Sequence, residues 1–134
     1  MHLLIYSDGA SRGNPGPAAI GVVIKDIDQH IVATLSECIG IATNNVAEYR
    51  AVLASLKEAH KLKADLVTLF TDSELLSRQL TGRYRVKSRS IMPYYFEVVK
   101  IAEKFKSFSV KHIGRELNVE ADLLANKALD NKFR

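Results

Sequence analysis

Four carboxylates stand where a strand is expected to end or a helix to begin. Asp8 follows an apolar β-type stretch and leads into a turn rich in glycine and proline, and Asp72 follows a second such stretch. Glu48 and Asp122 each lie four residues after an asparagine that suits a helix start, in what would be the first helical turn. A carboxylate is costly inside a core, so Asp8 is expected at the rim of its strand. The helix dipole favours acids in a first turn.

If these four ends converge, the site carries four negative charges within a few ångströms. Such a cluster needs cations to neutralise it, or some of its carboxylates must protonate. Oxygen ligands with open positions are what Mg²⁺ or Mn²⁺ requires. Taken singly, each acid has a simpler explanation: Glu48 and Asp122 complement a helix dipole, Asp72 caps a helix and Asp8 stabilises a turn. Only the combination points to a metal site.

The elements that must position these acids alternate along the chain. The first three strands are expected to form an antiparallel meander, because short polar or Gly/Pro-rich turns separate them. The pattern of apolar residues, caps and turns predicts an α/β domain with a mixed five-stranded sheet flanked by helices. The expected strands are 2–8, 18–24, 31–39, 66–71 and 108–113, and the expected helices begin near 43, 73, 93 and 118 and end near 62, 80, 106 and 130.

Length and composition favour one soluble domain over residues 1–134. The chain is 47% hydrophobic and 25% charged, and no run approaches the roughly 20 apolar residues that cross a bilayer. The first strand begins at once, so no signal or transit peptide is expected. The single cysteine, Cys38, has no intrachain partner, which fits a reducing cytoplasm, and is expected to be a small core residue.

The net charge of +4 is unevenly distributed. Between residues 75 and 96 there are five basic residues and no acid: Arg78, Arg83, Arg85, Lys87 and Arg89. A basic surface of this kind favours a polyanionic partner, although a solvated connector between two helices would have a similar composition.

Four segments of the sequence resemble the motifs of type 1 ribonuclease H. The stretch YSDGASRGNPGP at 6–17 is similar to the opening motif of that family, and TNNVAE at 43–48 is similar to its second motif. TDS at 71–73 and NVEADLLA at 118–125 are similar to the third and fourth acidic motifs. The matches span residues 3–129 in the family's order. The basic protrusion of the longer bacterial members is absent, so the chain resembles the short, archaeal-like form.

The resemblance implies a ribonuclease H-like fold with strand order 3-2-1-4-5. It implies an endonuclease that cuts the RNA strand of an RNA/DNA hybrid and leaves a 5′-phosphate and a 3′-hydroxyl. It also implies two divalent ions, Mg²⁺ or Mn²⁺, held by Asp8, Glu48, Asp72 and Asp122. Two metals about 3.5–4 Å apart can clamp an in-line displacement.

Further site residues follow from the same resemblance. Contacts to the hybrid are expected from Ser11, Asn14, Thr43, Asn44 and Glu74. Where the basic protrusion is absent, the chain's own short basic segment is expected to contact phosphates through Arg83, Arg85 and Lys87. Glutamine is common at the position of Glu74, and an ionised carboxylate can only accept hydrogen bonds. An auxiliary residue that assists the water or the departing product is expected before the last helix. Both His112 and Arg115 remain candidates for that role.

Two other functions share these features. A non-catalytic hybrid-binding module would keep the fold, but it would not need all four acids. Another nuclease of the same superfamily, such as an exonuclease or a domain of a reverse transcriptase, would not need the complete TNN-x-x-E segment. The leading hypothesis is therefore a monomeric ribonuclease that acts on RNA/DNA hybrids. Neither a membrane nor an obligate protein is expected as its partner.

Overall fold

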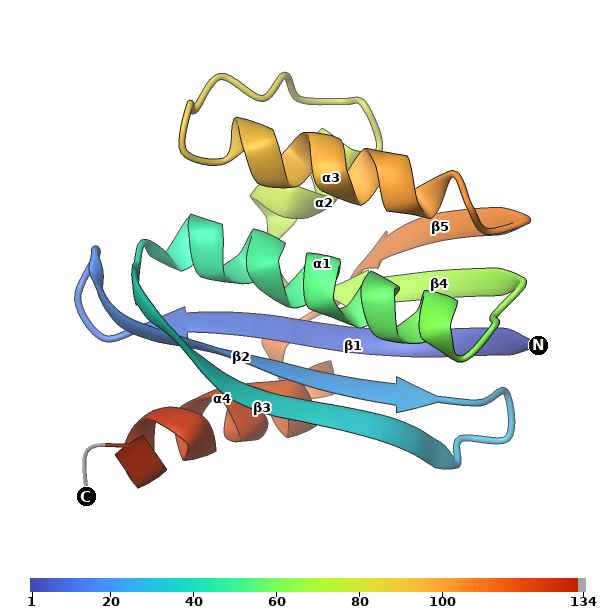
Figure 1. Cartoon of the computed structure of the whole chain (residues 1–134), viewed down its shortest axis with the longest axis horizontal. Coiled ribbons are helices and arrows are strands. Elements are labelled where there is room, and N and C mark those ends of the chain that lie inside the picture. The colour runs from blue at the N-terminus through green and yellow to red at the C-terminus, as the bar shows by residue number, and fades with distance from the viewer. Residues whose placement is uncertain (133–134) are drawn as a thin grey trace.

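The computed structural model describes residues 1–132, in which strands and helices follow the expected order. Thr43 caps the first helix by accepting from the backbone N–H of Val46. The elements are β1 (His2–Ser11), β2 (Gly16–Lys25), β3 (Ile31–Ala42), α1 (Asn44–Lys61), β4 (Leu66–Thr71), α2 (Glu74–Leu80), α3 (Met92–Ala102), β5 (Ser107–His112), the 3₁₀ helix η1 (Arg115–Leu117) and α4 (Val119–Lys132), as Figure 1 shows.

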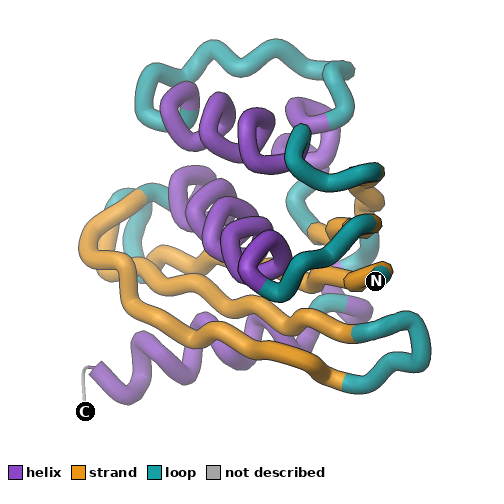
Figure 2. The backbone as a smooth tube through the Cα atoms, turned by 45° about the vertical axis from the view of Figure 1, so that its right-hand side comes forward, coloured by secondary structure: helices purple, strands orange, loops and turns teal. Residues whose placement is uncertain are grey.

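The five strands form one sheet in the order β3-β2-β1-β4-β5, which confirms the predicted order. β1 pairs antiparallel with β2, and β2 with β3, whereas β1–β4 and β4–β5 are parallel. Helices α1, α2 and α3 lie on one side of this mixed sheet and α4 lies on the other (Figures 1 and 2). Within residues 1–132, no helix is both long enough and apolar enough to span a membrane.

The main core lies between the sheet and α1. Alternate residues of β1, Leu3 and Ile5, are fully buried there, as strand periodicity requires, and they pack in one cluster with Val52 and Leu56 of α1. This packing fixes the position of α1 against the sheet, including the N-terminal part of the helix that carries Glu48.

Helix α4 approaches the opposite face of the sheet through a glycine. A Cβ atom on Gly21 of β2 would lie 2.0 Å from the carbonyl oxygen of Ala121, so only glycine permits this contact. Ala121, Ala125 and Leu129 form the buried stripe of α4. The close contact sets the distance from the sheet to the first turn of α4.

The predicted end of the first strand is wrong. β1 does not stop at Asp8 but continues to Ser11, because β2 remains paired with it from Gly21 to Ala18. Asp8 is therefore a strand residue, and it is only 6% exposed. β3 likewise runs further than expected, to Ala42, whereas α3 ends earlier than expected, at Ala102.

Candidate active site

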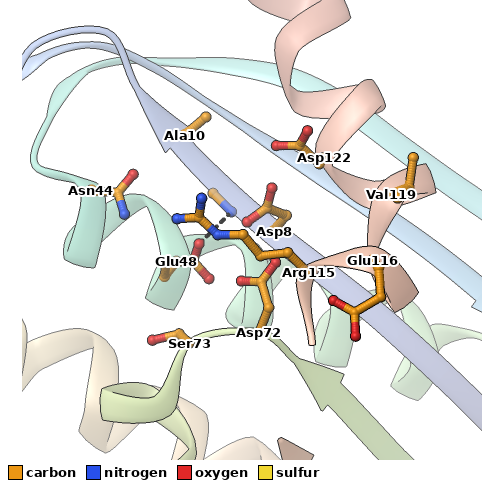
Figure 3. Close-up of a pocket in the computed structure, with 11 residues that line it drawn as sticks. Asp8, Ala10, Asn44, Glu48, Asp72, Ser73, Arg115, Glu116, Val119 and Asp122 are labelled. Atoms are coloured by element: carbon orange, nitrogen blue, oxygen red, sulfur yellow. Dashed lines mark hydrogen bonds between the residues drawn. The ribbon is translucent and has the colours of Figure 1, made fainter. Parts of the chain in front are cut away.

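Asp8 faces an opening that the sheet itself creates. β4 pairs with β1 only as far as Tyr6 and Phe70, so β1 continues past its neighbour. Asp72 comes directly after the end of β4 and turns toward Asp8 across that opening (Figure 3). The helix after it is capped by Ser73, whose side chain accepts from the backbone N–H of Leu76. Asp72 is therefore not the cap of this helix, and its carboxylate faces the site.

Glu48 reaches the same opening from α1. The prediction that it lies in the first turn is wrong: α1 begins at Asn44, and no acid occupies its first turn. Glu48 comes one residue after this first turn, on the buried face of the helix, and is 4% exposed. Its Oε1 accepts from the backbone N–H of Gly9 at 3.2 Å, the dashed line in Figure 3, while Oε2 has no hydrogen-bond partner among residues 1–132.

Asp122 does lie in the first turn of α4, as predicted. Its Oδ1 accepts from the side-chain amide of Asn126 at 3.2 Å. Carboxylate oxygens of Asp8, Glu48 and Asp72 all lie within 4.8 Å of one another. Asp122 stands outside this tight group but lines the same hollow of about 500 Å³ (Figure 3). The structure thus places all four predicted acids around one hollow.

Burial and mutual repulsion disfavour the charged forms of Asp8 and Glu48. Burial is the main cause that raises the pKa of Asp8, followed by its close contact and charge interaction with Glu48 and by the nearby Asp122 and Asp72. Burial also raises the pKa of Glu48, although its close contact with the Asp8 carboxyl and its hydrogen bond from Gly9 act in the opposite direction. A divalent cation would relieve both effects.

The donor set fits such a cation. The site offers hard carboxylate oxygens, including the buried Oε2 of Glu48 that no protein group satisfies. Within residues 1–132, none of the four acids forms a salt bridge with a Lys or Arg side chain. The charge of the cluster is therefore available to metal ions.

In a second cluster of acidic residues, the carboxylate is already engaged in backbone hydrogen bonds. Asp26, Asp28 and His30 also bring possible ligand atoms together, in the turn between β2 and β3. There, Oδ1 of Asp26 accepts from the backbone N–H groups of Asp28 and His30, at 2.9 and 3.0 Å. These bonds lower the pKa of Asp26 and hold the turn, so its carboxylate already has partners.

The two candidates for the auxiliary role lie in different places. Arg115, in η1, lines the carboxylate hollow, and its positive charge acts to lower the pKa of Glu48 (Figure 3). His112 is the last residue of β5, paired in register with Thr71, and lines a separate hollow together with Glu74. Only Arg115 shares a hollow with the four acids.

Asn118 has a role that the sequence did not reveal. It was expected to cap α4, but within the described part of the chain its Oδ1 has no hydrogen-bond partner. Its Nδ2 instead donates to the carbonyl oxygen of Ser7 at 2.9 Å and to Oδ2 of Asp72 at 3.3 Å. The side chain is 1% exposed. Asn118 therefore connects β1 and the end of β4 to the start of α4, and its place in the fourth motif was the only hint of this.

The glycine-rich turn after β1 is held against the start of α1. Ser11 Oγ donates to the carbonyl oxygen of Ala42 at 2.7 Å, and it also contacts the carbonyl oxygen of Gly13. Asn14 Oδ1 accepts from the backbone N–H of Asn44 at 3.0 Å. Asn44 lines the carboxylate hollow. Of these expected substrate contacts, Asn44 therefore lies beside the acids, and hydrogen bonds hold Ser11 and Asn14 against the segment that leads into it.

The basic residues of the segment after α2 line two different hollows. Arg85 and Lys87 line a hollow of about 410 Å³ together with Asn14 and Thr43. Arg83 instead lines the hollow that contains Glu74 and His112. Glu74 follows Ser73 of the carboxylate hollow and forms an ion pair with Arg78 at 2.8 Å.

The sequence and the structure are similar to known proteins. The family model described as Reverse transcriptase-like matches residues 6–128. A ribonuclease HI of Halobacterium salinarum is 43% identical over 94% of this chain and 63% of its own length. The structure of RNase H1 from that archaeon superposes with a TM-score of 0.95, at 41% identity over 98% of this chain and 99% of the other.

Two further proteins are similar to this chain. LC11-RNase H1, solved in complex with an RNA/DNA hybrid, superposes with a TM-score of 0.93, at 38% identity over 98% of this chain and 99% of the other. A bifunctional protein of Mycobacterium tuberculosis is 40% identical over 97% of this chain. The chain spans only 36% of that protein's length.

Proposed function

The chain belongs to the type 1 ribonuclease H family, and on that basis we propose that it is an endonuclease that hydrolyses the RNA strand of RNA/DNA hybrids. The observation that carries the proposal is the group of Asp8, Glu48 and Asp72, two of them buried and the third half-buried, whose oxygens lie within 4.8 Å of one another. The complex of LC11-RNase H1 with a hybrid supports the choice of substrate.

The four acids would hold two divalent cations, Mg²⁺ or Mn²⁺. When bound, such ions supply an activated water and charge stabilisation for an in-line displacement at phosphorus. The protein's own contribution is to fix the ligands. Gly9 orients Glu48 through its backbone N–H, and Asn118 orients Asp72 through its side-chain amide. Cleavage by this route requires no covalent protein intermediate. Its products would carry a 5′-phosphate and a 3′-hydroxyl.

Arg115 is the residue that we assign to the auxiliary role. Its guanidinium offers hydrogen-bond donors and no acceptor, so it cannot act as a base. It can instead form bidentate hydrogen bonds to non-bridging oxygens of the phosphate or of the departing product. Its place in the carboxylate hollow supports this assignment over His112.

Recognition of RNA would depend on its 2′-hydroxyls, which both donate and accept hydrogen bonds. Asn44 lines the carboxylate hollow, and Asn14 is hydrogen-bonded to its backbone N–H, so both are candidates for contacts with the 2′-hydroxyls. Glu74 can serve only as an acceptor while it is ionised. Ser11 and Thr43 would contact the hybrid from the same turn region, and Arg83, Arg85 and Lys87 would bind its phosphates.

The test is a substrate panel with purified protein and Mg²⁺ or Mn²⁺. It compares labelled RNA/DNA hybrid, duplex RNA, single-stranded RNA and duplex DNA. We expect internal cuts in the RNA strand of the hybrid and little cleavage of the other substrates. Tight binding of the hybrid without cleavage in either metal would favour a non-catalytic binding module and contradict the proposal. Sizing by light scattering would test our further expectation of a monomer, and localisation of a tagged chain would test the cytoplasm as its compartment.

A further inference from the structure

The connector between α2 and α3, residues 81–91, encloses a hollow that the cleavage chemistry does not use. In Figure 1 this connector is the loop that passes alongside α3. The hollow measures about 450 Å³ and lies between the connector and α3. Its lining includes Arg83, Tyr84, Arg85, Val86, Tyr95 and Phe96. We call it the connector hollow.

The connector is held in place at several points. The backbone N–H groups of Arg83 and Tyr84 both donate to the carbonyl oxygen of Arg78, at 2.8 and 3.0 Å. Val86 is partly buried and packs against the main core. The guanidinium of Arg78 lies 5.2 Å from the ring centroid of Tyr84, a cation–π contact that supports the ring. The hollow therefore has fixed walls.

Two of its aromatic side chains are exposed without an apparent structural reason. Phe96 is 60% exposed and Tyr84 is 47% exposed. Tyr95 packs its ring against that of Phe96 in an edge arrangement with centroids 5.5 Å apart. Exposed aromatic rings gathered around a hollow are typical of a binding surface.

The charge of the connector hollow indicates the chemistry of its ligand. Two arginines line it and no carboxylate does, and Glu97, which follows Phe96 in α3, is not part of the lining. Aromatic faces that stack on bases, combined with arginines that bind phosphates, are how proteins hold single-stranded nucleic acid.

The connector hollow also borders the surface proposed to bind the hybrid. Arg85 lines both this hollow and the one that contains Asn14 and Thr43. Arg83 lines both this hollow and the one that contains Glu74. A strand that leaves the hybrid on either side would therefore meet an arginine at the edge of the connector hollow.

We propose that the connector hollow binds unpaired nucleotides of a single strand that continues beyond the hybrid, by stacking a base against Phe96 and Tyr84. This extends the proposed function, because it assumes that the adjoining duplex is the hybrid. Duplexes with single-stranded extensions would then be bound more tightly than blunt ones.

The test compares a blunt hybrid with hybrids that carry a DNA or RNA extension of about six nucleotides at either end. KM is measured for the wild type, Phe96→Ala, Tyr84→Ala and Phe96→Tyr. At least one extension should lower KM about fivefold or more in the wild type, as stacking of one base predicts. Phe96→Ala and Tyr84→Ala should abolish this gain without changing kcat on the blunt hybrid, and Phe96→Tyr should keep it. Ile31→Ala, an exposed apolar truncation on β3, is the matched control.

Binding of a labelled single-stranded DNA, measured by anisotropy, separates this inference from the proposed function. If the protein cleaves no hybrid but binds the single strand through Phe96, the proposed function fails and the role of the hollow stands. If extensions leave KM unchanged and Phe96→Ala binds the single strand as well as the wild type does, the connector hollow is not a nucleotide site.

Discussion

The backbone N–H of Gly9 donates to Oε1 of Glu48 at 3.2 Å, so the central strand itself orients one acid of the site. The contact exists because α1 approaches β1 at a residue without a side chain. A Cβ on Gly9 would lie 2.2 Å from the carbonyl carbon of Ala47. The same glycine therefore sets both the helix-to-strand distance and the position of Glu48.

Gly9→Ala should both destabilise the protein and remove its activity. The added methyl group must push α1 away from β1, at a cost of about 3 kcal/mol of unfolding free energy. Denaturant unfolding and hybrid cleavage measure the two effects. Gly82→Ala is the control, because Gly82 has a φ of +79° but nothing within 4 Å of its Cβ position. It should cost roughly 1 kcal/mol and leave cleavage intact. Equal losses in the two variants would contradict the account of Gly9.

The metal-free protein should lose stability as the pH rises. The pKa of Glu48 is raised from 4.5 to about 7 and that of Asp8 from 3.8 to about 10, mainly by burial. Because the folded state holds these protons more tightly than the unfolded state, their stabilising contribution is complete below pH 4 and is lost as the pH rises through these values.

Thermal melts in EDTA at about pH 5.5 and pH 8.5 would check this linkage. Asp8→Asn should be more stable than the wild type at the higher pH, with a smaller difference at the lower one, because the amide cannot ionise. Addition of Mg²⁺ should raise the melting temperature of the wild type more than that of Asp8→Asn. A wild-type advantage over Asp8→Asn in EDTA at pH 8.5 would show that repulsion among the acids does not destabilise the metal-free site.

Much of the fold followed from the sequence because strand and helix patterns are local. The sheet order also followed, through the resemblance of the four motifs, and the structure confirms it. The end of β1 did not, because the strand is prolonged by pairing with β2 across a glycine-rich turn that looks like a stop signal. Local pattern cannot report such a tertiary pairing.

Within the site, the sequence identified the four acids but not their supporting contacts. Asn118 had the residue type and place of a helix cap. Its side-chain amide nitrogen, however, donates to the carbonyl oxygen of Ser7 and to the carboxylate of Asp72. The choice between His112 and Arg115 was also out of reach, since it depends on where β5 ends and η1 begins. These features depend on residues that are distant in the chain.

Arg115→Ala should lower kcat on the hybrid by about 10²-fold, the usual loss for one donor aimed at developing charge. Arg115→Lys should recover only part of it, because an ammonium cannot form the bidentate contact. His112→Ala is the comparison: His112 lies in another hollow, so its kcat should stay within about twofold of the wild type. Steady-state kinetics on one hybrid separate the two. A large loss in His112→Ala with a small one in Arg115→Ala would reverse the assignment.

Arg85→Ala should weaken hybrid binding and reduce its salt dependence. Arg85 lines the hollow that contains Asn14 and Thr43, where a phosphate contact is proposed. Loss of one phosphate contact should lower the magnitude of the slope of log K against log salt by about 1. Lys57→Ala, an exposed cation in the second half of α1, should leave the slope unchanged. An unchanged slope in Arg85→Ala would remove this residue from the hybrid surface.

Whether the acids of the carboxylate hollow carry out the cleavage is tested most directly by single-turnover kinetics. A labelled hybrid is cleaved in Mg²⁺ by the wild type, Asp8→Asn and Asp28→Asn. Asp28 is exposed in the turn between β2 and β3, so its variant controls for the loss of one negative charge. We expect internal cuts in the RNA strand by the wild type and Asp28→Asn, and a loss of at least about 10³-fold in Asp8→Asn with hybrid binding retained. Cleavage by Asp8→Asn at the rate of the wild type would contradict a role for Asp8 in the chemistry.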